Sequence, residues 1–320
     1  MTTTPAAAPS PGAVTPQLEA RVRPMGAVWF ASIVFSTGPV VVAGSAMSGA
    51  VFSFWRLWIG LPPLVAAAGW SMRRHGTGPT TRGWALAAVA GVAFGVHQVL
   101  FMTALKATSV VDVTLMNTLA PIVVGIAAVP MFGERPGLRF RMWSLLAILG
   151  AAGIAVLGST GVDGNPAGMA LAAGNVVAYA TYFVLSKQAR SDIDTWPFLL
   201  GALGTAAVVV SGWILVSGTD VGGIGAGDLV RCAFVAVVPG MLGHGAMTWA
   251  VRFVPANVPP VIMLTIPIFS GVLAWLVIGQ TVTAGKIVAG AITLGGVLGA
   301  IRSPAAPAVA VEALDLAEET

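Results

Sequence analysis

Ten uninterrupted apolar stretches fill most of the sequence, and each is long enough to cross a bilayer core of about 30 Å as a helix. The stretches lack the alternation of apolar and polar residues that a membrane β-barrel requires. The sequence therefore predicts an all-α integral membrane protein with ten transmembrane helices. The predicted helices cover residues 26–45, 49–71, 84–105, 110–131, 142–160, 167–186, 196–217, 230–251, 256–278 and 284–301.

The composition excludes several classes of soluble protein. Hydrophobic residues make up 57% of the 320 residues and charged residues only 9%, whereas a soluble domain carries about a quarter charged residues. The basic residues are scattered and form no stripe with aromatic residues, so we expect no nucleic-acid partner. Cys232 is the single cysteine, which excludes an intramolecular disulfide and a cysteine metal cluster. The expected surroundings are the lipid bilayer.

Two short terminal segments differ from the apolar body. Residues 1–24 are small, polar and rich in proline, and residues 303–320 are small and acidic. Neither has the apolar periodicity of a folded element, so we expect both to be disordered tails. We do not expect the first to be a signal peptide, because the apolar stretch that follows starts too late.

The basic residues predict the orientation in the membrane. If the N-terminus is cytoplasmic, 12 basic residues fall on the inner face and three on the outer face, as the positive-inside rule requires. Both termini are then cytoplasmic. The outer three are Lys106, Arg231 and Lys286. The inner ones are Arg21, Arg23, Arg73, Arg74, Arg82, Arg135, Arg139, Arg141, Lys187, Arg190, Arg252 and Arg302.

The two halves of the sequence resemble each other at an offset of 146 residues. Pro121 then matches Pro267, and Lys106 matches Arg252. We expect two five-helix repeats, residues 25–160 and 161–302. Because five is odd, the second repeat must enter the membrane upside down, which gives an inverted-topology repeat. Two similar halves of opposite orientation favour alternating access around a central cavity.

This arrangement resembles the EamA family of the drug/metabolite transporter superfamily. The resemblance includes Arg56 in the string SFWRLW and the pattern from Leu119-Ala120-Pro121 to Gly133-Glu134-Arg135; the second half departs from it at Gly279-Gln280-Thr281. It implies a carrier of the bacterial inner membrane, commonly an exporter of amino acids or other small metabolites. It also implies a cavity lined by the first, third, fourth, sixth, eighth and ninth helices.

Ionisable residues inside the predicted helices are the first site candidates, because each costs about 2.5–3.5 kcal/mol at a helix centre. Arg56 and Asp112 lie at similar depths in their helices. We expect them either to pair or to exchange partners in a water-filled cavity; a static structural pair is the alternative. His97 and His244 could relay protons or only form hydrogen bonds between helices. Gln98 matches His244 at the repeat offset.

Polar residues near the mid-helix prolines complete the predicted binding site. Asn117 lies one turn before Pro121, and Thr265 lies two residues before Pro267, where a broken helix could line a cavity. Asn175, Tyr179 and Tyr182 share a face of the sixth predicted helix. Trp29 and Trp249 either wall the cavity or belong to the interfacial aromatic belt. We expect Glu134 with Arg135 to form a simple local ion pair or to mark the membrane topology.

The sequence gives little support to an enzyme. It contains no zinc-protease helix, nucleophile elbow or phosphate-binding loop. Gly225-Ala226-Gly227-Asp228 matches a short aspartyl-protease string, but that chemistry needs a second carboxylate, and we expect Asp228 in an outer loop. No cofactor and no metal are expected.

The predicted function is secondary transport of a small polar or amphipathic metabolite, directed outward and driven by a proton or substrate gradient. The alternative is a flippase for a lipid-linked intermediate, or a membrane interaction protein of the same fold. A monomer or a weak homodimer is expected.

Overall fold

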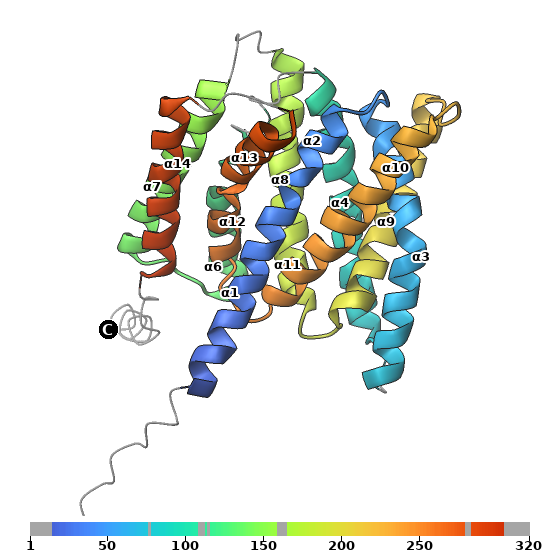
Figure 1. Ribbon diagram of the computed structural model, residues 1–320. Helices are drawn as coiled ribbons and strands as arrows, with labels where there is room; N and C mark the ends of the chain where they lie inside the picture. The colour runs from blue at the N-terminus through green and yellow to red at the C-terminus, as the bar shows by residue number, and fades with distance from the viewer. Residues whose placement is uncertain are drawn as a thin grey trace, which may run out of the picture.

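The protein is a bundle of helices that run the length of the molecule (Figure 1). The structure, a computed structural model, describes residues 15–75, 78–107, 113, 116–158, 165–278 and 283–303, and all regular elements within these ranges are helices. The first half holds α1 (Thr15–Phe35), α2 (Thr37–Ala43), α3 (Gly49–His75), α4 (Thr81–Ala107), α6 (Ala120–Phe132) and α7 (Leu138–Gly158). The second half holds α8 (Pro166–Ala189), α9 (Thr195–Ser217), α10 (Ala226–Val235), the π-helix η2 (Ala236–Gly243), α11 (His244–Ala250), α12 (Val258–Met263), α13 (Ile266–Ile278) and α14 (Ala284–Ile301).

Seven helical segments within the described residues are long and apolar enough to cross a membrane. Residues 120–132 and 258–273 form shorter apolar helices, and α7 overlaps the predicted stretch 142–160. Each predicted stretch thus overlaps helix, and the all-α membrane architecture is confirmed, whereas ten crossings stay a prediction. The seven segments are Arg23–Val42, Gly49–Arg74, Thr81–Ala107, Pro166–Ala189, Thr195–Ser217, Ala226–Ala250 and Ala284–Ile301.

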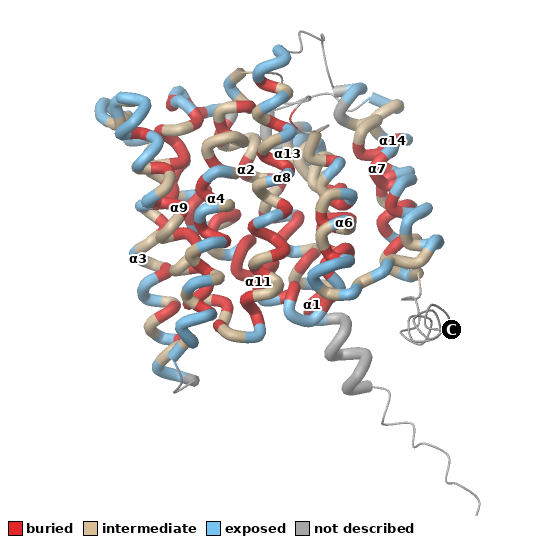
Figure 2. Tube along the Cα trace, turned by 180° about the vertical axis from the view of Figure 1, so that it is seen from behind, coloured by how far each residue is buried: buried red, intermediate tan, exposed pale blue. Residues whose placement is uncertain are grey.

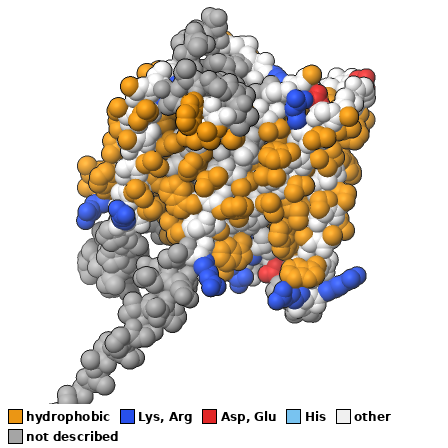
Figure 3. Space-filling view, in the orientation of Figure 1, with side chains coloured by type: hydrophobic (Ala, Val, Ile, Leu, Met, Phe, Trp, Pro, Cys, Tyr) orange, Lys and Arg blue, Asp and Glu red, His pale blue; other side chains and the backbone are white. Residues whose placement is uncertain are grey.

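The outer surface of the bundle is apolar along its middle. Figure 3 shows a broad orange belt of hydrophobic side chains, with most of the blue Lys and Arg side chains below it. Large apolar side chains are exposed on the outside of the helices; Leu215 is 80% exposed and Val216 86%. Figure 2 shows the buried residues on the inward sides of the helices. Such an extensive apolar surface fits contact with lipid rather than with water.

The lower edge of the bundle in Figure 1 is called the basic end below. The helices α3, α11 and α14 end there (Figure 1), and these ends carry Arg73, Arg74, Arg252 and Arg302. Helix α1 also begins at this edge. Its first residue is Thr15, so residues 15–24 are helical rather than part of a disordered tail.

Small residues bring α4 close to α9. A Cβ atom on Gly95 would lie 2.8 Å from Cβ of Val209, and one on Gly91 would lie 2.6 Å from Cβ of Thr205. Both distances are shorter than a van der Waals contact, so only glycine fits at these positions. Close backbone approach of this kind is how small residues hold membrane helices together.

Two helix breaks lie at equivalent positions of the two halves. Turns at residues 118–119 and 264–265 precede α6 and α13, and Pro121 and Pro267 follow them within the first turn of the next helix. Proline lacks an N–H and clashes with the preceding turn, so it interrupts a helix at its N-terminal side. The breaks are 146 residues apart, which agrees with the offset of the sequence repeat.

Candidate functional site

Five rings from both halves of the chain pack together in the bundle and form what we call the ring cluster: Phe94, His97, Tyr179, Tyr182 and His244. Phe94 lies 4.7 Å from the ring of Tyr182, 5.0 Å from His244 and 5.4 Å from His97, measured between centroids. His97 lies 5.1 Å from Tyr179. Four of the predicted site residues therefore meet, at the contact of α4 with α8 and α11.

Helical spacing explains how each helix supplies its rings. Residues three apart share a helix face, so α4 presents Phe94 with His97 and α8 presents Tyr179 with Tyr182. His244 is the first residue of α11, directly after η2. Phe94 was not among the predicted site residues. Its spacing of three residues from His97, which places both on one helix face, could have indicated it.

Several buried polar atoms around this cluster lack a hydrogen-bond partner among the described residues. They are His97 Nδ1, Tyr182 Oη, Asn175 Oδ1, Gln98 Oε1 and Arg56 Nε. Leaving a buried polar group unpaired costs about 1–3 kcal/mol, so native proteins seldom retain many without a bound water or ligand. The concentration of such atoms on α3, α4 and α8 favours binding of a polar ligand next to the ring cluster.

Two polar contacts link α8 to the broken helices. Asn175 Nδ2 donates to Asn117 Oδ1 at 3.0 Å, which joins α8 to the segment just before α6. The hydroxyl of Tyr179 donates to Sδ of Met263 at 3.3 Å, which joins α8 to the end of α12. Three of the predicted site residues thus lie around the two helix breaks: Asn117, Asn175 and Tyr179.

Arg56 approaches the cluster from α3 and is 6% exposed. Its Nη2 lies 3.8 Å from the place of a Cβ on Gly240, so it packs against η2, and its charge acts on both His97 and His244. The π-helix was not predicted, although Pro239 and Gly240 disturb the regular helical pattern there. Asp112 lies outside the described residues, so its pairing with Arg56 stays a prediction.

The other predicted site residues are not part of the ring cluster itself. Trp29 makes an edge contact with Phe269 at 6.4 Å, and Trp249 is 38% exposed and packs on Phe253. Thr265 is buried and donates its hydroxyl to Ile262 O at 2.7 Å, within its own turn. Gln98 is buried on α4, where its backbone carbonyl accepts from Ser53 on α3 at 3.4 Å.

A partly buried ion pair at the end of α6 joins the two halves, and we call it the repeat link. Lys187 Nζ lies 2.5 Å from Oε1 of Glu134 and donates to Val254 O at 2.9 Å. The other oxygen of Glu134 accepts from Ala256 N at 2.6 Å. The expected pair of Glu134 with Arg135 is wrong, because the corner after α6 directs Glu134 toward α8 instead.

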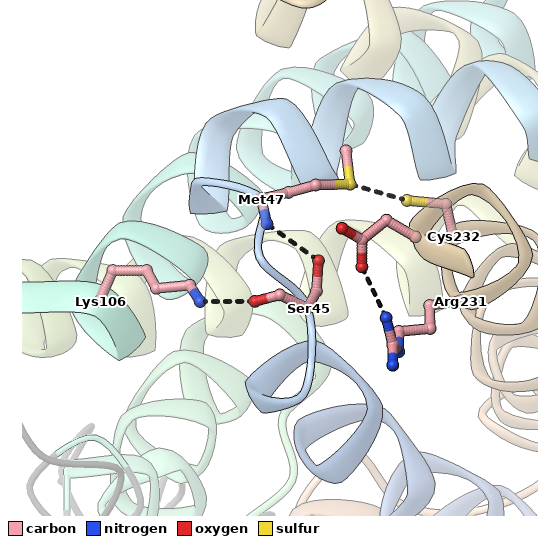
Figure 4. A network of polar contacts seen from close by, with 6 residues as sticks. Ser45, Met47, Lys106, Arg231 and Cys232 are labelled. Atoms are coloured by element: carbon pink, nitrogen blue, oxygen red, sulfur yellow. Dashed lines mark hydrogen bonds and ion pairs between the residues drawn. The ribbon is translucent and has the colours of Figure 1, made fainter. Parts of the chain in front are cut away.

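The opposite end of the bundle carries a second group of contacts, one of which joins the two halves (Figure 4). Lys106 Nζ donates to Ser45 O at 3.4 Å, and Met47 N donates to Ser45 Oγ at 3.1 Å. Met47 Sδ lies 3.8 Å from Sγ of Cys232 on α10. The loop between α2 and α3 therefore packs on the second half.

Asp228 lies in this region, and its position corrects the sequence interpretation. It is in the first turn of α10 rather than in a loop, and its Oδ1 is 2.8 Å from Nη1 of Arg231. A carboxylate near a helix N-terminus is favoured by the helix dipole. The aspartate thus has a structural partner one turn away.

Comparisons with known proteins agree with this architecture. The model of the EamA-like transporter family matches residues 24–156 and again residues 166–302. A protein of Archaeoglobus fulgidus named as an uncharacterized transporter is 26% identical over 203 residues, which are 63% of this chain and 71% of that protein. A crystal structure with 17% identity and a TM-score of 0.69 covers 88% of this chain and 96% of its own, which shows the same fold. Because the family model matches most of the sequence, in two consecutive repeats, the chain belongs to the EamA-like transporter family and is a multi-pass membrane protein.

Proposed function

We propose that the chain is a secondary carrier that exports a small amphipathic metabolite, such as an amino acid, across the bacterial inner membrane. The observation that carries this proposal is the ring cluster, which forms where the two repeats meet. Around it lie buried polar atoms that have no hydrogen-bond partner among the described residues. Aromatic rings offer an apolar surface, and the polar atoms offer a few orienting contacts, as ligand sites commonly do.

Each polar group near the cluster has a distinct proposed role. Arg56 supplies positive charge for an anionic group of the substrate or, alternatively, pairs with Asp112 during the cycle. The hydroxyl of Tyr182 and the amide of Asn175 would form hydrogen bonds to polar atoms of the substrate. His97 and His244 are candidates for proton relay, since histidine changes charge near physiological pH.

The transport mechanism that we propose is alternating access between two inverted repeats, with ten crossings and both termini in the cytoplasm. The basic end would face the cytoplasm, in agreement with the positive-inside rule. In the conformation described, the repeat link joins the halves at this end and the loop between α2 and α3 joins them at the other. Transport would require these two sets of contacts to open in turn.

Flux measurements with purified protein in liposomes test this proposal. A panel of radiolabelled amino acids is compared with and without a pH gradient, and the variant Tyr182→Phe is measured beside the control Trp249→Phe. We expect the Tyr182 variant to reduce flux of the transported compound and the control to retain it. Equal flux in both variants would remove the ring cluster from the binding site, and absence of flux for the whole panel would refute the substrate class.

A further inference from the structure

One membrane-spanning segment changes its helical winding in the middle. The apolar segment Ala226–Ala250 consists of α10, the π-helix η2 and α11, which follow one another without a turn. A π-helix pairs each N–H with the carbonyl five residues back, whereas an α-helix pairs it with the carbonyl four residues back. The backbone of η2 therefore turns less per residue, which changes the faces that α10 and α11 present relative to each other.

The exposed residues of this segment show the effect of the π-helix. The large apolar residues exposed on it are Val230, Phe234, Val237, Leu242 and Trp249. Before η2 and after it, exposed residues recur at a spacing of seven, which is two α-helical turns, but Leu242 follows Val237 by five. In an α-helix, five residues turn by about 500°, which is about 140° more than a full turn. The exposed residues therefore stay on one side of the segment because η2 takes up an additional residue.

The same change of winding decides where His244 points. His244 follows Val237 by seven residues, so a regular α-helix would turn by about 700° between them and place His244 within about 20° of the exposed face of Val237. Val237 is 40% exposed, whereas His244 is 8% exposed. The ring of His244 lies 4.8 Å from that of Phe35 and 5.0 Å from that of Phe94. The π-helix thus turns His244 away from the lipid side and into the ring cluster.

Pro239 and Gly240 explain why the segment is a π-helix at this point. Proline has no N–H, so Pro239 cannot donate to Val235 O, its partner in an α-helix, and its ring would clash with that carbonyl. In a π-helix, Val235 O is instead the partner of Gly240, five residues on. A Cβ on Gly240 would lie only 2.8 Å from Val235 O, so glycine is the residue that fits there.

We infer that Pro239 is a positioning residue of the ring cluster: together with Gly240 it maintains the π-helix that turns His244 toward Phe94. Helix α4, the counterpart in the first repeat, is α-helical from Thr81 to Ala107, so the two repeats reach the cluster with different windings. Contact of His244 with the transported compound rests on the proposed function, whereas its orientation into the cluster does not.

Nuclear magnetic resonance of the purified full-length chain in detergent micelles tests this inference. The chain contains three histidines, so isotope-labelled histidine gives few signals, and His244→Gln identifies the signal of His244. The neighbouring rings of Phe35 and Phe94 displace this signal from that of free histidine. The displacement therefore reports whether His244 lies in the ring cluster.

The main variant combines Pro239→Ala with Gly240→Ala. It supplies the missing N–H and adds a methyl group that the π-helix cannot accommodate, so it favours a regular α-helix. The matched control combines Pro63→Ala with Gly69→Ala, which changes a proline and a glycine inside the long α-helix α3.

A third variant deletes Val238 in addition to the changes at Pro239 and Gly240. His244 then follows Val237 by six residues instead of seven, and a regular α-helix places it about 120° away from the exposed face. The deletion should therefore return His244 to the ring cluster. A role of Pro239 in stability alone would predict the opposite, because deleting a residue would damage the fold further.

We expect the main variant to lose the displacement of the His244 signal, the deletion to restore most of it, and the control to keep the signal of the unchanged protein. If the main variant does not fold, the deletion variant decides, since the inference requires it to fold and to show the displaced signal. The inference is overturned if the main variant leaves the signal in place, or if the deletion does not restore it. Flux does not enter this measurement, so the inference and the proposed function can fail separately.

Discussion

Breaking the repeat link should open the basic end of the bundle. Lys187→Met removes the ammonium group from Glu134 and from Val254 O while keeping a side chain of similar length. Glu134 then retains the backbone N–H of Ala256 as its described partner. The first repeat would lose its charged connection to the second at this end.

The size of this effect follows from the burial of the pair. The side chains of Lys187 and Glu134 are 15% and 21% exposed, between an exposed pair worth about 0.2–1 kcal/mol and a buried pair whose breaking costs about 3–5 kcal/mol. We expect a loss of about 2 kcal/mol from the closed state at this end, which corresponds to roughly a 30-fold change in the opening equilibrium.

Cysteine accessibility measures this change. Ala250→Cys places a thiol at a buried position of α11, near the repeat link, in a background in which Cys232 is replaced by serine. The rate of reaction with a membrane-impermeant maleimide should rise by roughly 30-fold when Lys187→Met is added, since the rate follows the open fraction. In a second experiment, the protein keeps Cys232 and lacks the Ala250→Cys change. This native thiol, buried near the opposite end, should not become more reactive when Lys187→Met is added.

Two further variants decide whether the ion pair itself is responsible. Lys106→Met removes a lysine contact at the opposite end and should leave the reactivity of the thiol introduced by Ala250→Cys unchanged. Glu134→Gln combined with Lys187→Met should have a smaller effect than the sum of the single changes, because both act on one interaction. If Lys187→Met leaves the reactivity of that introduced thiol unchanged, the reasoning is refuted.

Three other predictions concern packing and the ring cluster. Gly95→Leu should lower stability by about 2 kcal/mol, because its Cβ would lie 2.8 Å from that of Val209; an unchanged unfolding temperature would contradict this. Tyr182→Phe deletes a hydroxyl that lacks a hydrogen-bond partner among the described residues, so the unfolding temperature should stay the same or rise while substrate flux falls. Asp112→Asn should alter flux or its pH dependence, and unchanged values for both would exclude Asp112 from the mechanism.

The helices and their breaks were predictable because their signals are local in sequence. Runs of apolar residues identify membrane helices, and proline interrupts a helix wherever it occurs. Pro121 and Pro267 therefore predicted the two breaks, which the structure places 146 residues apart. The residues 15–24 are helical although they lack an apolar pattern, so the beginning of α1 could not be read from composition.

The contacts between the repeats were less predictable, because they join segments far apart in sequence. Nothing near Glu134 indicates Lys187 rather than Arg135 as its partner, since that choice depends on how α6 and α8 pack. The repeat offset matched Gln98 with His244, yet the structure brings His97 to the ring cluster with His244. Neighbouring residues of a helix point in different directions, so an equivalence in sequence does not decide which side chain meets the other repeat.

The most direct test of alternating access is a pair of distances measured by spin labelling in the protein with Cys232 replaced. One pair spans the repeats at the basic end, Arg135→Cys with Ser191→Cys, and the other spans them at the opposite end, Ala46→Cys with Gly222→Cys; all four positions are exposed. Addition of the transported compound should lengthen one distance while the other shortens. If both distances move in the same direction, or if neither responds, the two repeats do not alternate around the ring cluster.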